Sequence, residues 1–247
     1  MTGVQTCALP ISTIQANRAL LDRFLDRVSG RPVILVGNSM GGLISMMEAA
    51  ARPDSVAGLV LVDPALPRAL RTRPDPFVTA AFAAYAVPGI GERLVRRRYR
   101  TLGPDGLVRD TLRMCCVDPS LVPQETVDAM IEVARQRMQF AWAQPSYLAA
   151  ARSLVTFMAR RSRVTEIITS IAAPTLLIQG THDRLVSLAS AREAARLRPD
   201  WSFEIFDNIG HVPMLEAPER FVETVSAWMD GAGRAAVLAA AADPARG

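Results

Sequence analysis

Residues 33–42 read VILVGNSMGG, and this stretch decides the fold. Its first four residues are aliphatic without interruption, which is typical of a strand buried on both faces of a parallel sheet. A turn rich in glycine follows, and residues 43–51 then continue as an apolar helix. The stretch therefore predicts a strand, a tight turn that carries Ser39, and a helix.

This turn makes Ser39 the candidate nucleophile. Residues 37–41 fit the pattern G-x-S-x-G, in which a serine on a strained strand-to-helix turn is held above the sheet. Because the turn is tight, we expect the flanking Gly37 and Gly41 to be required as small residues. The backbone N–H of Met40 opens the following helix, so it is the candidate donor to an oxyanion.

A serine hydroxyl needs a base to attack at neutral pH, and the chain has only two histidines. His211 follows a predicted strand on a loop from which it can reach the carboxyl edge of the sheet, so it is the candidate base. His182 is the alternative base, although a surface or supporting role fits it better.

The imidazole in turn needs an ionised acid to orient it. Asp183 lies just past a predicted strand, at the same edge of the sheet, and is the candidate acid. Asp63, also at a strand end, and Asp207, shortly before His211, remain alternatives. Asp63 is otherwise interpreted as a turn former before a proline.

The rest of the chain predicts an α/β fold with a helical insertion. Further apolar strands are expected at three places and amphipathic or apolar helices on either side of them, which favours a parallel sheet covered by helices. Between residues 65 and 165 no strong strand is found and prolines punctuate helical stretches. The expected strands are 33–36, 56–62, 174–178 and 202–206, and the expected flanking helices are 14–28, 188–197 and 219–229, with a loop over 208–218.

The chain order Ser39, Asp183, His211 resembles the α/β-hydrolase superfamily, in its serine hydrolase branch with a helical cap. Residues 61–64, 180–184 and 210–219 carry further matching motifs. Serine at position 39 argues against the branches that use aspartate there, the dehalogenases and epoxide hydrolases.

The resemblance implies a partial hydrolase fold, with a parallel sheet equivalent to the family's strands 5 to 8. In this interpretation residues 12–64 and 166–231 form the core, residues 65–165 the helical cap, and the Ala-rich residues 232–247 a disordered tail. The family's earlier strands, and its loop with the second oxyanion donor, have no counterpart here. We therefore expect residues 33–36 to form an exposed sheet edge, and this truncated form to be poorly folded or inactive.

The first residues, MTGVQTCALPI, have neither the charged start nor the cleavage site of a signal peptide. They match a translation of a common sequencing-adapter oligonucleotide codon by codon. We therefore interpret residues 1–11 as an artefact of sequence assembly.

Composition excludes several partners. The net charge is +4, but all 28 basic residues are arginine, as in a GC-rich bacterial genome, and no basic cluster with aromatics predicts nucleic-acid binding. The longest apolar run, residues 77–90, is shorter than the ~20 residues of a membrane span. Three cysteines and two histidines supply neither a disulfide framework nor a metal site, so we expect a cytoplasmic protein without metal or cofactor.

The expected function is hydrolysis of a carboxylic ester of an apolar small molecule through an acyl-enzyme intermediate. Aromatic and methionine side chains in the cap favour an apolar substrate, although such residues also build helical cores. One alternative is a carbon–carbon bond hydrolase of ring-cleavage products, because residues 37–42 resemble that group's turn, but Val212 stands where the group has tryptophan. Another is a non-catalytic binding relative. The cap residues in question are Phe77, Phe82, Tyr85, Met114, Met138, Phe140, Trp142, Tyr147, Phe157 and Met158.

Overall fold

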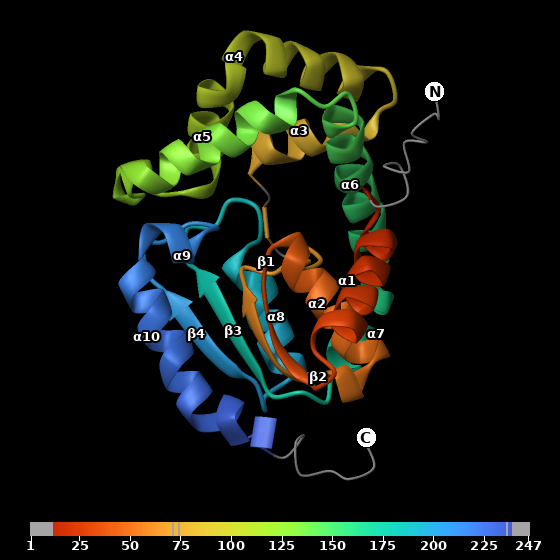
Figure 1. The fold of residues 1–247 in the computed structure, drawn as a ribbon, viewed down its shortest axis with the longest axis vertical. Helices are drawn as coiled ribbons and strands as arrows, with labels where there is room; N and C mark the ends of the chain where they lie inside the picture. The colour runs from red at the N-terminus through yellow and green to blue at the C-terminus, as the bar shows by residue number, and fades with distance from the viewer. Residues whose placement is uncertain (1–11, 71, 74, 236, 239–247) are drawn as a thin grey trace.

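A computed structural model describes residues 12–70, 72–73, 75–235 and 237–238. Four parallel strands form one sheet in the order β1-β2-β3-β4, so the predicted α/β fold is confirmed. The carboxyl ends of the strands meet at the edge that faces α3, α4 and α5 (Figure 1). The strands are β1 (Val33–Asn38), β2 (Val56–Val62), β3 (Thr175–Gly180) and β4 (Ser202–Phe206).

The two faces of the sheet have separate cores, because successive side chains of a strand point to opposite faces. Leu59, Leu61 and Leu177 pack in one cluster with helices α1, α2, α7 and α8. Val60 and Ile178 lie in a second cluster, which α10 covers. The helices are α1 (Ile14–Val28), α2 (Met40–Ala51), α7 (Arg161–Ser170), α8 (Leu188–Leu197) and α10 (Pro218–Trp228).

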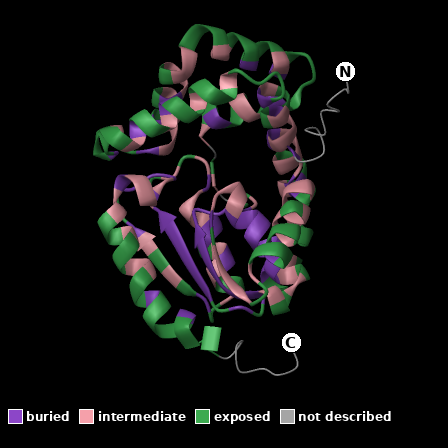
Figure 2. Cartoon of the chain, viewed as in Figure 1, coloured by how far each residue is buried: buried purple, intermediate pink, exposed green. Residues whose placement is uncertain are grey.

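Strand β1 lies at the edge of the sheet, as predicted from the sequence. Every residue of β2 is buried, whereas Val36 of β1 is 59% exposed. The contrast is visible in Figure 2, where the central strands are buried and β1 is only partly so. The serine turn therefore follows an edge strand of the sheet.

The segment from α3 to α6 is helical and lies largely above the carboxyl edge (Figure 1). The α4 segment is two helical stretches joined at a kink, where Gly103 leaves the helical conformation with φ 62° and Pro104 begins the second stretch, so this proline punctuates the segment as the sequence predicts. Helix α7 packs in the core beside α2, so the predicted cap limit at residue 165 falls within a core helix. The elements are α3 (Pro76–Ala86), α4 (Ile90–Cys115), α5 (Gln124–Met138) and α6 (Ala143–Met158), with short 3₁₀ turns η2 (Pro53–Ser55) and η3 (Pro119–Leu121).

Two expectations near the C-terminus are corrected. The predicted loop over residues 208–218 contains a short helix, α9 (Pro213–Glu216). The predicted disordered tail begins inside a π-helical turn, η4 (Met229–Gly233), and residues 234–235 and 237–238 are also helical. Residues 239–247, like the adapter-like residues 1–11, lie outside the described residues. Within the described part of the chain, no helix is both long enough and apolar enough to cross a membrane.

Candidate active site

Ser39 occupies the strained turn between β1 and α2. Its backbone has φ 53° and ψ −120°, a conformation that costs a non-glycine residue about 1–3 kcal/mol unless its surroundings hold it. Two backbone hydrogen bonds do so: the Ser39 N–H donates to Val62 O at 3.1 Å, and the Ala65 N–H donates to Ser39 O at 2.9 Å. The end of β2 thus fixes the serine turn.

The small residues that this turn needs are Gly37 and Gly42. A Cβ on Gly37 would lie 2.7 Å from the backbone of Gly41, and one on Gly42 would lie 2.8 Å from Cβ of Pro64. A Cβ on Gly41 would meet no atom of the described residues within 4 Å outside its own turn of the helix, so the prediction that Gly41 is sterically required is wrong. Gly37 of β1 and Gly41, the second residue of α2, therefore lie too close for a side chain on Gly37. This close approach lets α2 begin directly after Ser39.

Met40 is the first residue of α2. The first N–H groups of a helix have no acceptor within the helix, and they carry the positive end of its dipole. The Met40 N–H is therefore available at the turn, and the Met40 side chain packs against the core cluster around α2.

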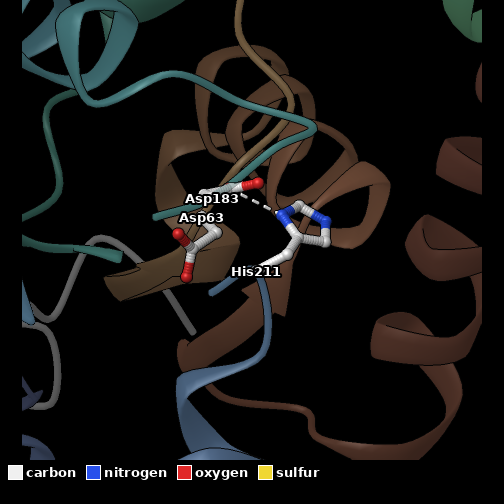
Figure 3. A group of neighbouring side chains, drawn as sticks. All are labelled: Asp63, Asp183 and His211. Carbon is white, nitrogen blue, oxygen red and sulfur yellow. Dashed lines mark hydrogen bonds and ion pairs between the residues drawn. The ribbon is translucent and has the colours of Figure 1, made fainter. Parts of the chain in front are cut away.

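Asp183 and His211 are brought into direct contact at the carboxyl edge (Figure 3). His211 Nδ1 lies 2.7 Å from Asp183 Oδ2, and the two side chains are 5% and 0% exposed. The Asp183 carboxylate also accepts hydrogen bonds from the N–H groups of Leu185 and Val186, at 2.7 and 3.0 Å. These donors hold the carboxylate in position, and with Nδ1–H directed to it, His211 Nε2 is left as a proton acceptor.

The backbone of His211 is fixed from two sides. Its N–H donates to Cys115 O, at the end of α4, at 2.6 Å. Its carbonyl accepts from Asn38 Nδ2 at 3.0 Å, and the same amide donates to Val62 O at 3.0 Å. Because Asn38 immediately precedes Ser39, this amide links the histidine loop to the serine turn.

Glu216 connects the same loop to the overlying helices. Its buried carboxylate accepts from Val117 N–H at 2.7 Å and Asp118 N–H at 3.0 Å through Oε1, and from Gly210 N–H at 2.7 Å through Oε2. Three backbone donors from two segments therefore converge on one carboxylate.

Asp63 is the third acid at this edge, and it is fully buried. Its Oδ1 accepts from Gln179 Nε2 at 2.7 Å and from Gly180 N–H at 2.9 Å, and Gln179 Nε2 also lies 3.1 Å from Asp183 Oδ2. Burial, followed by the negative charge of Asp183, raises the pKa of Asp63 to about 9.

The other candidates from the sequence lie apart from this network. His182 is exposed, and its Nδ1 is paired with the hydroxyl of Thr181 at 3.0 Å. Asp207 is also exposed. Of the alternatives, only Asp63 is joined to the Asp183–His211 pair.

Sequence reasoning missed the supporting residues Asn38, Gln179 and Glu216 and the carbonyl of Cys115. Gln179 gave one signal, because it is a polar residue at the end of an otherwise apolar strand. Their partners lie far away in the sequence, so the pairing itself could not be foreseen.

Asp63, Asp183 and His211 also meet the spacing of a metal site, since one ligand atom from each lies within 4.8 Å of the others. However, His211 Nδ1 and Asp183 are already joined by a short hydrogen bond, and Asp63 Oδ1 is occupied by two donors. This hydrogen bonding fits proton handling better than metal coordination.

A cavity of about 620 Å³ lies among helices α3 to α6. It reaches Leu185, whose N–H binds Asp183, so it borders the acid loop. Phe140 and Trp142 instead stack on each other at the surface, and Phe157 is buried in the core below. The lining includes five of the predicted substrate-contacting residues, namely Phe82, Tyr85, Met114, Met138 and Tyr147.

The sequence matches the profile of the Alpha/beta hydrolase family over residues 6–224. The chain belongs to this family. It is 25% identical to a monoacylglycerol lipase from Xenopus laevis over 222 residues, which are 88% of this chain and 61% of that protein. It is 23% identical to a 2-hydroxy-6-oxononadienedioate/2-hydroxy-6-oxononatrienedioate hydrolase from Pseudomonas sp over 201 residues, 81% of this chain and 64% of that hydrolase.

A solved structure of a thermophilic esterase from Thermogutta terrifontis is similar, with a TM-score of 0.59 and 25% identity, over 93% of this chain and 74% of the esterase. This hydrolase chain thus spans 61% and 64% of the length of the two curated relatives above.

Proposed function

We propose that this α/β hydrolase cleaves carboxylic esters of apolar small molecules, with Ser39 as nucleophile, His211 as base and Asp183 as the orienting acid. The observation that carries the proposal is the 2.7 Å contact between His211 Nδ1 and Asp183, in a buried pair beside the strained serine turn. Family membership and the lipase and esterase relatives support ester hydrolysis.

In the proposed reaction, His211 Nε2 takes the proton of Ser39 Oγ as Oγ attacks the ester carbonyl carbon. The negative oxygen of the tetrahedral intermediate faces the Met40 N–H at the start of α2. His211 then gives its proton to the leaving alkoxide, and the alcohol departs. A water molecule, deprotonated by His211, attacks the acyl-enzyme and releases the carboxylic acid and free Ser39.

The cavity among α3 to α6 is the proposed place for the apolar part of the ester. Its volume of about 620 Å³ falls in the range of small-molecule sites, roughly 300–1,000 Å³. Its walls carry Phe82, Met114 and Met138, which favour an acyl or alcohol group without charge.

Carbon–carbon bond hydrolysis is the second candidate, supported by the Pseudomonas relative. Val212, directly after His211, packs against a cluster in α4 and α5 that contains Val108 and Leu112. The side chain after the base therefore supports the overlying helices here, which favours the ester substrate.

The test combines labelling with kinetics. We expect a fluorophosphonate to add one label to the wild type, on Ser39, and nitrophenyl esters to be hydrolysed. Ser39→Ala should remove the label and lower kcat/KM by at least about a thousandfold, because the nucleophile is lost. The control Ser162→Ala, at an exposed position of α7, should match the wild type.

Failure to label Ser39 would contradict the proposal. Faster turnover of a vinylogous diketone than of any ester would favour the carbon–carbon bond hydrolase instead. Binding of esters without labelling or turnover would indicate a non-catalytic relative.

A further inference from the structure

Asp63 lies at the carboxyl edge of the sheet, close to Asp183 and His211, but has no role in the reaction described above. It directly follows β2, has a positive φ of 42°, and its side chain is completely shielded from solvent. Oδ1 accepts two hydrogen bonds, from Gln179 Nε2 and from Gly180 N–H. Among the described residues, Oδ2 has no donor at all.

The groups that face Asp63 disfavour an ionised form. Asp183 is the nearest charge, and Glu216 on α9 adds a second negative one. His211 contributes a ring already paired with Asp183. The half-buried thiol of Cys115, at the end of α4, lies near Asp183 and Glu216, and burial raises its pKa to about 11. A buried carboxylate with one empty oxygen and two negative neighbours would be strongly destabilising.

We propose that Asp63 functions as a neutral carboxylic acid, a positioning residue that donates its proton toward Asp183 while the Gln179 amide bridges the two side chains. The proposal rests on the function given above. Oδ2 receives no hydrogen bond from the described residues, but when it carries a proton it can itself donate one. The neighbouring acceptor is the carboxylate of Asp183. The raised pKa of Asp63 agrees with this state at neutral pH.

The neutral acid has a consequence for His211. With Asp63 protonated, Asp183 is the single negative charge in direct contact with the ring, and its carboxylate is held by Leu185, Val186, Gln179 and the histidine itself. Ionisation of Asp63 would place a second carboxylate against Asp183 and break the donor contact between them. Activity should therefore fall as the pH rises through the pKa of Asp63.

The test uses Asp63→Asn, because asparagine reproduces an acceptor at Oδ1 and a donor at the position of Oδ2. We expect kcat/KM at pH 7 to stay within about threefold of the wild type, whereas Asp63→Ala, which leaves its partners unpaired, should lower it by roughly tenfold or more. The loss of activity expected near pH 9 in the wild type should disappear in Asp63→Asn. The exposed acid Asp207 supplies the control, and Asp207→Asn should keep the wild-type profile.

Two results would overturn the proposal. If Asp63→Asn lost activity at pH 7 as severely as Asp183→Asn, the carboxylate charge of Asp63 would be required, as an acid or as a cation ligand. If the alkaline loss persisted unchanged in Asp63→Asn, another group would cause it.

A second measurement is independent of activity. Carbon NMR of protein labelled at the aspartate carboxyl carbons, with Asp63→Asn to assign the signal, should show Asp63 titrating near pH 9. A titration near the ordinary value of about 4 would refute the proposal, whether or not the protein hydrolyses esters. Absence of Ser39 labelling together with a titration near pH 9 would contradict the proposed function alone.

Discussion

The carboxyl edge of the sheet and the helices above it are built in opposite ways. At the edge, the side chains of Asp63, Asp183 and His211 are buried, and they form hydrogen bonds with groups from several separate segments. Among α3 to α6, the cavity walls are mainly apolar, and ion pairs such as Arg152–Glu92 are partly exposed. For the proposed ester hydrolase, the comparison implies that buried hydrogen bonds hold the reacting groups, whereas side-chain volume in the cavity sets the fit of the substrate.

Such a division has a physical reason. A general base must stay within hydrogen-bonding distance of the proton it removes, so small displacements are costly. An apolar pocket discriminates by the volume it offers, and its walls tolerate changes of shape. Substitutions at the edge should therefore affect rate, and substitutions in the cavity should affect substrate choice.

Substitution of Glu216 is expected to have the largest effect and is the strongest test of this comparison. In Glu216→Gln, the amide nitrogen must face backbone N–H groups of either Gly210 or Val117 and Asp118, which leaves donors unpaired. We expect the free energy of unfolding to fall by about 1–3 kcal/mol and kcat/KM to fall by roughly tenfold or more, because the His211 loop loses its tie to the end of α4. Urea unfolding and ester kinetics measure the two effects.

The matched control is Glu219→Gln, at an exposed position of α10 in the same segment, which should behave as the wild type. Wild-type activity and stability in Glu216→Gln would show that the buried hydrogen bonds of this carboxylate do not hold the His211 loop in place. The proposed contrast between the carboxyl edge and the cavity would then be wrong.

A cavity substitution should have a smaller effect of a different kind. Ala134 is a half-buried residue on α5 that lines the cavity, so Ala134→Phe adds volume inside it. We expect the ratio of kcat/KM for a long-chain over a short-chain nitrophenyl ester to drop by roughly tenfold, with kcat for the short ester little changed. Ala83→Phe, at an exposed position of α3, should leave that ratio unchanged.

An equal loss of rate for both esters would mean that the cavity wall and the reaction geometry are coupled. An unchanged ratio would place the apolar part of the substrate elsewhere.

The sequence predicted the sheet well because its signals are local. Strand β2 is a continuous apolar run, β3 has an aliphatic centre, and the serine turn between β1 and α2 is encoded by adjacent residues. The supporting contacts were missed because they join residues far apart in the chain. Asn38 and His211, for example, are separated by 173 positions, and Glu216 binds residues 98 and 99 positions away.

The helices above the edge were predicted only as a region. Prolines were predicted to punctuate helices there, and α4 is indeed broken by the kink at Gly103 and Pro104, but the bounds of the individual helices were not predicted. Aromatic residues were grouped by type, although Phe157 packs in the lower core and Phe140 stacks on Trp142. Composition could not separate these environments, because tertiary packing decides which apolar side chain faces a cavity.

The smallest effect is expected at Glu92, a partly exposed residue of α4 that forms an ion pair with Arg152 of α6. Its carboxylate accepts from Arg152 at 2.8 Å and from Gly89 N–H at 2.7 Å, and the hydrogen bond with Arg152, followed by backbone donors, lowers the pKa of Glu92 to about 2. Because the pKa of Glu92 is lower in the folded protein, its ionised form stabilises the fold when the pH is above the ordinary pKa of a glutamate. This contribution is lost as the pH falls toward 2. Glu92→Gln should therefore lower Tm slightly at pH 7, and the difference from the wild type should vanish near pH 2, with Glu125→Gln as an exposed control on α5. Ester kinetics should not change, because solvent screens this pair, and within the described residues neither side chain is hydrogen-bonded to His211. If Glu92→Gln lowered Tm as much as Glu216→Gln, helices α3 to α6 would depend on fixed polar contacts as much as the carboxyl edge of the sheet does.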